Sequence, residues 1–462
     1  MKHLVSTGLF SFILIGSALA DIDFNAGADL RIRQEIMDHL PGLPGGGRAG
    51  SFAVRKYTNW IRFRARAWGE IKGVTQNEST WRLYTRVADE CKWYVKPWNN
   101  ANTFPDELIL DNLFLEAKDL FDGLLDFSIG RQDMLFLYGL DHIFVDGTPG
   151  DGSRTTYSDM VRVGFNFEDD RRLDLFALYN FDDSDVRWGT DRSKHRGLTS
   201  LGGAEPDMDD WGFGAIWSDK LAENVPYQLF VMQKNTASYR HPKYGKRPRS
   251  QRELVGAKVM PRLDEEWSLQ LEAMGQVGDA GGKTLYGAST YAGANWKSAR
   301  EGWKPFAKFG YEYKSGSKDA ATADGGHGTW DPMWARGAVE SEMFLYGTHY
   351  GVGWWSNCHY PKLTMGVDFG KYHKVSAQFA PIFAATQDHL GGGNGTFKGF
   401  QTFLRYDFPI FTNTMRQDIF NSETERGVEV FGHVLAEFFN PGDYYETDKP
   451  AYFVRWQVDF KF

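Results

Sequence analysis

The chain has 462 residues, 16% of them aromatic, and a formal net charge of −8, which gives no support for nucleic-acid binding. Its 51 glycines, 35 phenylalanines, 21 tyrosines and 16 tryptophans accompany a mean hydropathy of −0.46. This composition is typical of many alternating strands joined by polar turns, rather than of several globular domains.

The first twenty residues predict a secretory signal peptide. Lys2 and His3 precede an apolar run over residues 4–15, and the segment 18–20, Ala-Leu-Ala, fits a small-x-small cleavage site. A retained membrane anchor is the alternative. No later stretch reaches ~18 uncharged apolar residues, the length that a spanning helix needs. We therefore expect a signal peptide over 1–20 and one β-barrel domain over 21–462.

Segments in which apolar and polar residues alternate recur along the rest of the chain. Because side chains alternate across a strand with period two, each segment predicts a strand with one apolar and one polar face. Residues 111–121 fit a strand or a weak helix equally well. The clearest strands cover residues 61–67, 161–168, 267–273, 307–313, 428–438 and 452–462.

Turns and loops of two lengths separate these strands. Asp169 and Asp170 predict a short hairpin, whereas residues 37–55, 182–210, 238–251, 315–335 and 385–397 predict long loops. Short turns at one end and long loops at the other are typical of a membrane barrel. Aromatic residues near the strand ends fit interfacial girdles; they are Trp60, Trp81, Trp211, Trp217, Trp267, Tyr313 and Trp456.

These features predict an all-β protein, a transmembrane antiparallel β-barrel with long extracellular loops. At roughly 25 residues for each strand and its connection, the mature chain forms on the order of 16–18 strands around an aqueous lumen. A closed barrel has no free edge, so residues 452–462 must pair with the first strand. This aromatic-ended strand also resembles the carboxyl-terminal signature of bacterial outer-membrane proteins, which the outer-membrane assembly machinery reads.

Basic residues repeat on the polar faces of several predicted strands. Arg62, Arg64 and Arg66 share one register, and Glu70 alone cannot neutralise all three. Such a face would attract an anionic solute, and a guanidinium group binds carboxylates bidentately. The alternative is that arginine–glutamate ladders only brace the wall. The candidate pore-lining residues of this kind are Arg31, Arg33, Arg62, Arg64, Arg66, Arg82, Arg86 and Arg162.

The stretch "LLDFSIGRQDMLFLYGLDHIFVDGTPGDGSRTTYSDMVRV" resembles the alginate export family of bacterial outer-membrane channels. The similarity rests on Gly130-Arg131-Gln132, on Tyr157 and Asp159, and on the upstream segments "LRIRQE" and "NWIRFRARAWGEI". It implies an outer-membrane location, an 18-stranded barrel and an arginine-lined constriction for passive transport of a polyuronate such as alginate. It also adds Arg131 to the pore-lining candidates, although parity places Arg131 on the lipid side unless the chain bends at Gly130.

Other functions have weaker support in the sequence. A general porin without a specific ligand is the main alternative to a channel for anionic saccharides. His433, with Glu429 and Glu437 on its face, is the best candidate for catalysis, but no G-x-S-x-G motif accompanies it, and we expect no enzyme activity.

We expect no cofactor. The acidic segments 182–185 and 207–210 are solvated loops or calcium sites. Cys91 and Cys358 either form a disulfide or are unrelated thiols. The expected partners are outer-membrane lipids, the assembly machinery and an anionic saccharide.

Overall fold

The structure is a computed structural model of the chain. It describes residues 19–42, 53–55, 57–75, 78–96, 108–133, 137–144, 157–180, 187–188, 209–241, 245–319, 327–334, 356–412 and 428–462. The predicted signal peptide lies almost entirely outside these residues and stays a prediction. No helix within the described residues is long and apolar enough to cross a membrane.

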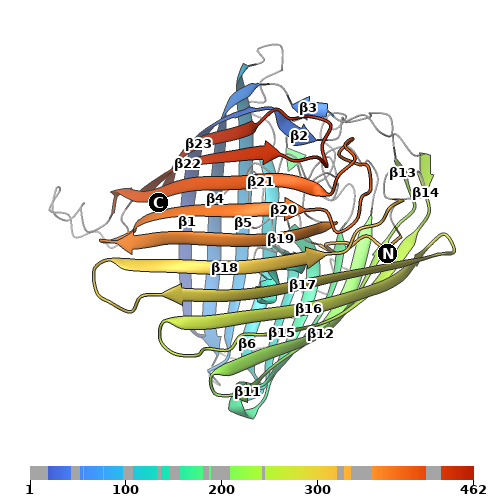
Figure 1. Cartoon of the computed structure of the whole chain (residues 1–462). Coiled ribbons are helices and arrows are strands. Elements are labelled where there is room, and N and C mark those ends of the chain that lie inside the picture. Colours follow the sequence, from blue (N-terminus) through green and yellow to red (C-terminus); the bar gives the residue numbers. More distant parts are fainter. Residues whose placement is uncertain are drawn as a thin grey trace.

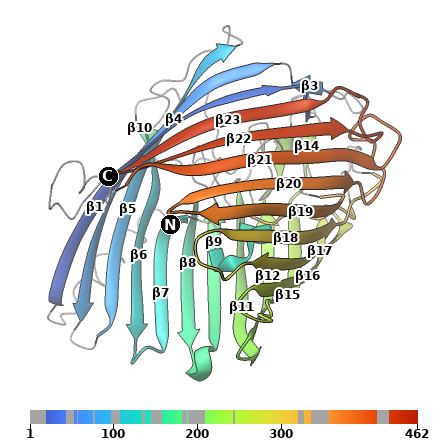
Figure 2. The ribbon, with the colours of Figure 1, turned by 60° about the vertical axis from the view of Figure 1, so that its left-hand side comes forward.

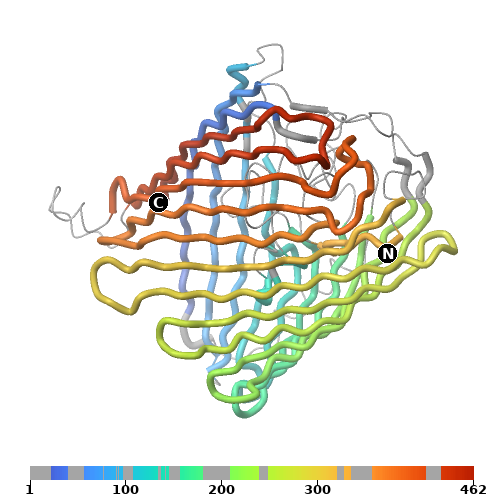
Figure 3. Tube along the Cα trace, in the orientation of Figure 1, coloured from blue at the N-terminus to red at the C-terminus, as the bar shows by residue number. Residues whose placement is uncertain are grey.

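Eighteen long antiparallel strands form one closed barrel (Figures 1 and 3). Each strand pairs with the next, and the last pairs with the first, which confirms the predicted fold class. The strands are β1 (Leu19–Asp38), β4 (Thr58–Thr75), β5 (Thr80–Lys96), β6 (Leu108–Leu120), β7 (Leu125–Asp133), β8 (Tyr157–Asn166), β9 (Arg172–Asn180), β11 (Asp210–Ala222), β12 (Val225–Thr236), β15 (Ser250–Val259), β16 (Trp267–Ala280), β17 (Lys283–Lys297), β18 (Lys304–Lys314), β19 (Cys358–Phe369), β20 (His373–Phe383), β21 (Phe397–Phe411), β22 (Glu429–Pro441) and β23 (Ala451–Lys461).

Short elements lie in the connections. Residues 111–121, for which helix and strand were both open, belong mostly to strand β6. The short elements are β2 (Leu40–Gly42), β3 (Ala53–Arg55), β10 (Arg187–Trp188), β13 (Tyr239–His241), β14 (Gly245–Arg247), the 3-10 turns η2 (Leu137–Gly139) and η3 (Glu168–Asp170), and the helix α2 (Asp141–Phe144).

The two ends of the barrel differ in the lengths of their connections. The predicted hairpin between β8 and β9 is confirmed, and Asp169 and Asp170 both adopt a φ of 61° there. This end, the short-turn end, also carries the turns that follow β4, β6, β11, β15, β17 and β19, together with the longer connection between β21 and β22. The opposite, long-loop end carries the five predicted long loops, and also the connections 97–107 and 134–156, which the sequence did not single out.

The two faces of the barrel wall differ as the alternation predicts. On β23, Val454 and Trp456 point outward and are 43% and 39% exposed, whereas Arg455 and Gln457 are buried. Apolar side chains exposed on the outer face of a closed barrel are suited to contact with acyl chains. Phe453 is the one apolar residue on the inner parity of this segment, and it is fully buried.

Closure of the barrel follows from the pairing of β1 with β23 (Figure 2). Leu30 pairs with Phe460 and Ile36 with Val454, so outward apolar residues meet across the closing seam. The side chain of Trp456 also donates a hydrogen bond to Gln34 at 2.9 Å. Cys91 and Cys358 are both buried, and the two thiols do not form a disulfide with each other.

Candidate transport pathway

One buried carboxylate, that of Glu35 on β1, lies among three guanidinium groups. Arg33 on the same strand is 3.0 Å away, Arg62 of β4 is 3.4 Å away and Arg455 of β23 is 3.8 Å away. The indole nitrogen of Trp60 donates a further hydrogen bond to Glu35. Because one carboxylate offsets one positive charge, this part of the inner face keeps an excess of positive charge.

Two further arginines of β4 share a second carboxylate. Arg66 lies 2.8 Å and Arg64 lies 3.3 Å from Asp29 of β1. The sequence predicted that Glu70 alone could not neutralise this triplet, and in the structure Glu70 pairs with Lys72 at 2.6 Å. The acids that serve the triplet therefore come from the neighbouring strand β1, across the sheet.

The inward residues within 29–35 of β1, 62–66 of β4 and 455–459 of β23 form what we call the arginine face. Its acids are Asp29, Glu35 and Asp459, and Asp459 lies opposite Arg31 in the register. Its arginines are Arg31, Arg33, Arg62, Arg64, Arg66 and Arg455. The structure thus brings together the five candidates on β1 and β4, and adds Arg455 from the far end of the chain.

The two candidates on β5 are bound to acids. Arg86 lies 2.9 Å from Asp111 and 3.0 Å from Asp133, and Arg82 lies 3.2 Å from Glu116. An arginine with two carboxylate partners adds no net positive charge to the wall. Arg86 therefore fits the bracing role better than a solute-binding role.

Arg162 of β8 supports a loop. Its Nε donates a hydrogen bond of 3.1 Å to the hydroxyl of Tyr138, and its guanidinium group lies 5.0 Å from the centre of that ring. Since Tyr138 belongs to η2 in the β7–β8 connection, Arg162 fixes this connection inside the barrel.

Arg131 does not line the lumen. It pairs in register with Asp159, and its Nε lies 2.9 Å from that carboxylate. Its guanidinium group also lies 4.3 Å from the ring centre of Tyr157. Gly130 adopts a φ of 126°, yet the register continues through it and keeps Arg131 on the outward parity. Arg131 therefore belongs to the outer rim, which was the alternative that parity raised.

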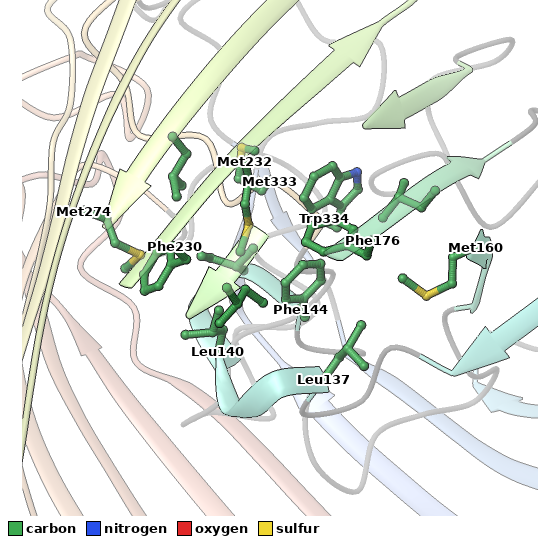
Figure 4. Packing of buried hydrophobic residues seen from close by; sticks show 14 of the residues in the cluster. Leu137, Leu140, Phe144, Met160, Phe176, Phe230, Met232, Met274, Met333 and Trp334 are labelled. Carbon is green, nitrogen blue, oxygen red and sulfur yellow. The ribbon is translucent and has the colours of Figure 1, made fainter. Parts of the chain in front are cut away.

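Two segments from the long-loop end fold inward and cover one arc of the inner wall. Residues 137–144 and 327–334 pack against apolar side chains on the inner face of β8, β9, β11, β12, β15 and β16 (Figure 4). Phe144 stacks on Trp334 with 5.4 Å between ring centres, and the backbone N–H of Trp334 donates to the carbonyl of Ile143. We call this group the loop cluster: Leu137, Leu140, Ile143, Phe144, Met160, Phe176, Leu178, Ile216, Phe230, Met232, Leu254, Met274, Trp330, Met333 and Trp334.

His142 on α2 ties the first segment to the wall. Its Nδ1 lies 2.9 Å from Glu272 of β16, and its Nε2 lies 3.0 Å from Glu312 of β18. Burial alone would lower the pKa of His142, but these two carboxylates raise it to about 10. The imidazolium ion then donates to both acids. Lys258 adds a hydrogen bond of 2.6 Å to the carbonyl of Gly139.

Asp331 ties the second segment to the wall. Lys234 of β12 and Arg252 of β15 lie 3.5 and 3.4 Å from it. Burial favours the neutral acid, but these two cations hold the pKa of Asp331 below its usual range. The side chain of Gln276 donates to the backbone carbonyl of Asp331 at 2.7 Å. Both inward segments are therefore held by polar contacts in addition to the loop cluster.

A cavity of about 870 Å³ lies in the short-turn half of the barrel and is lined by strands β16 to β22. We call it the lumen cavity. Its acids are Asp264, Glu265, Glu266, Asp368 and Glu437. Its cations are Arg262, Lys297, Lys308, Lys362, Lys374 and Arg405. The sequence did not predict this group, because it depends on which strands meet across the barrel.

Neither catalysis nor metal binding gains support from the described residues. His433 is buried and accepts a hydrogen bond of 3.0 Å from Nε of Arg455, so it is held as part of the inner wall. No group of side chains that could hold a metal ion occurs among the described residues. The acidic segment 182–185 lies outside them. In the other acidic segment, Asp210 accepts a hydrogen bond of 2.6 Å from Asn180.

Solved structures with the same architecture are bacterial porins of low sequence identity. OccAB1 of Acinetobacter baumannii is 10% identical with a TM-score of 0.55, and the match covers 96% of this chain and 99% of that one. OpdQ of Pseudomonas aeruginosa is 12% identical with a TM-score of 0.52, covering 95% and 98%. These similarities concern the fold alone. No curated protein matches the sequence.

The sequence itself carries the family signal. Residues 25–388 match the alginate export family, and this range covers most of the barrel from β1 to the end of β20. The match includes the β1 and β4 parts of the arginine face, both inward segments and much of the lumen cavity. Together with the closed barrel of eighteen strands, it shows an outer-membrane channel in family and in fold. The chain belongs to the alginate export family.

Proposed function

We propose that the protein resides in the bacterial outer membrane and lets anionic saccharides, including polyuronates of the alginate type, diffuse passively through its lumen. The coarser function, an outer-membrane channel, follows from the family and the fold. The anionic solute is our inference from the charges that line the inner wall. In the usual orientation of outer-membrane barrels, the long loops face the exterior and the short turns face the periplasm.

The observation that carries the proposal is the arginine face. Within residues 29–35, 62–66 and 455–459 it holds six arginines and three acids on the inner face of the wall. In a tube with low-dielectric walls, an excess of positive charge concentrates anions along the path. Guanidinium groups also suit the planar carboxylates of uronate sugars, because they offer two parallel donors.

The position of the two inward segments supports the same conclusion. They cover the apolar arc of β8 to β16 and are anchored there by His142 and Asp331. A solute passing through the barrel therefore runs along the remaining arc, where the arginine face and the lumen cavity lie. The apolar part of the wall is covered by the two inward segments and does not contact the solute.

Recording from single channels in planar bilayers tests this function. The wild-type channel should prefer anions, and its current should be blocked by uronate oligosaccharides but not by neutral ones of equal length. Replacing Arg62, Arg64 and Arg66 together by Gln should shift the reversal potential toward the value of a channel that does not discriminate between anions and cations. An unchanged reversal potential would refute the role of the arginine face, and block by neither saccharide would favour a general porin.

A further inference from the structure

Two lysines on the wall of the lumen cavity are candidates for holding a ligand. Lys308 of β18 and Lys374 of β20 are both exposed to the cavity. Within the described residues, neither forms an ion pair or a hydrogen bond. This differs from the arginine face, where Arg62 and Arg66 already hold carboxylates.

The positive neighbours of these lysines are occupied by acids of their own. Lys297 lies 2.6 Å from Asp368, and Lys362 lies 3.0 Å from Glu312. Lys374 reaches toward β18, where its ammonium group lies 4.9 Å from the ring centre of Phe306, two residues from Lys308 on the same face. Asp368 and Asp407 lie opposite Lys374 in the register, but they pair with Lys297 and Arg405. The two ammonium groups therefore remain without an ion pair in a space large enough for a solute.

The acids at the short-turn edge of the cavity do not fill this role. Glu266 accepts hydrogen bonds from the indole nitrogen of Trp296 at 3.0 Å and from the backbone N–H of Ala299 at 2.8 Å. It lies in the turn that follows β15 and is committed to holding that turn. Counting all lining residues, six cations face five acids, so the cavity keeps a net positive charge.

The rest of the lining offers flat rings and neutral polar groups. The ring of Tyr291 lies beside the paired glycines Gly293 and Gly310, where an added Cβ would come within 2.6 and 3.1 Å of its hydroxyl. Phe306 lies 4.9 Å below the ammonium group of Lys374. A few charged groups among aromatic and neutral polar ones are typical of a site for an organic ligand. The neutral polar lining comprises Ser268, Gln270, Asn295, Thr364 and Gln378.

We propose that Lys308 and Lys374 bind the carboxylates of an acidic oligosaccharide, so that the lumen cavity is a saturable site near the periplasmic mouth. This inference rests on the proposed function and deepens it. It assigns ion preference to the arginine face and solute retention to the two lysines. Free ammonium groups can exchange water for a carboxylate, whereas the arginines must first give up the acids that they hold.

Block of single-channel current by a uronate trisaccharide separates these roles. In the double variant Lys308→Gln/Lys374→Gln, the concentration for half-maximal block should rise roughly tenfold or more, because two charge-assisted contacts are lost. Lys371→Gln, in the turn between β19 and β20 and outside the cavity lining, is the matched control and should leave it unchanged. The variant Lys308→Arg/Lys374→Arg should keep strong block, which separates loss of charge from misfolding.

The outcomes distinguish this inference from the proposed function. If uronates block the wild type and the double Gln variant at the same concentration, the lysine site is refuted while the channel function stands. If replacing Arg62, Arg64 and Arg66 raises the blocking concentration more than replacing the lysines does, the division of roles is refuted. If no uronate blocks the wild type, both the site and the anionic-saccharide function fail.

Discussion

The Nε2 atom of His142 lies 3.0 Å from Oε1 of Glu312, and the same carboxylate oxygen lies 3.0 Å from Nζ of Lys362. Lys362 lines the lumen cavity, whereas His142 belongs to the inward segment at residues 137–144. One carboxylate thus joins the segment that narrows the barrel to the wall along which a solute passes.

Replacing His142 by Gln should loosen the inward segment without unfolding the barrel. The two ion pairs are lost at a cost of roughly 1–3 kcal/mol, but the loop cluster still packs against the wall. We expect larger open-channel current noise and a higher mean conductance in single-channel recordings. His389→Gln, at an exposed residue of the β20–β21 loop, is the control and should match the wild type. Equal noise in both variants would show that His142 does not hold the segment.

Alkaline pH should weaken the same contact. Because the pKa of His142 is raised from 6.5 to about 10 in the folded protein, its contribution to stability is fully present below pH 6.5. It falls as the pH rises above 6.5 and is lost once the pH passes about 10. Current noise of the wild type should therefore grow toward pH 10. The His142→Gln channel should show a flatter profile, and parallel profiles would contradict the assignment.

Glu35→Gln should lower the stability of the barrel and strengthen its preference for anions. The substitution leaves Arg33, Arg62 and Arg455 without their shared buried carboxylate, at a cost of about 3–5 kcal/mol. Urea unfolding in detergent or lipid vesicles measures this loss, and the reversal potential should move toward stronger anion preference. Glu301→Gln, in the exposed turn after β17, should alter neither quantity.

An arginine introduced on the outer face should lower the free energy of unfolding strongly only at the level of the hydrocarbon core. Val255, which is 64% exposed near the middle of β15, pairs with the exposed Val231. Val255→Arg should cost about 2–4 kcal/mol of unfolding free energy in lipid vesicles, whereas Leu263→Arg in the following turn should cost about 0–1 kcal/mol. Equal costs would mean that the outer apolar face does not contact acyl chains.

The strands were predictable because period-two alternation is a local signal. Residues 452–462 alternate almost perfectly, and β23 follows that pattern with Arg455 inside and Val454 outside. The turn at Asp169 and Asp170 was equally local. The strand β6 was ambiguous because its sequence lacks clean alternation, and a register shift occurs within it.

The contents of the lumen depend on contacts between distant residues. The sequence near Glu35 does not predict its contact with Arg455, because only closure of the barrel brings the two residues together. Two signals could have revealed the inward segments. Leu137, Leu140, Ile143 and Phe144 are apolar residues within a loop. Phe230 and Met232 are successive apolar residues on the inner parity of the wall strand β12. Together, an apolar loop and an apolar inner wall predict that the loop folds inward and covers the wall.

The hydrogen bond between Trp456 and Gln34 spans 422 positions of the sequence. Since the seam between β1 and β23 forms only when both strands are present, a nascent or truncated polypeptide that lacks residues 451–461 exposes two unpaired edges. In hydrocarbon such edges carry unsatisfied backbone groups, so the barrel can close only when residues 451–461 are present.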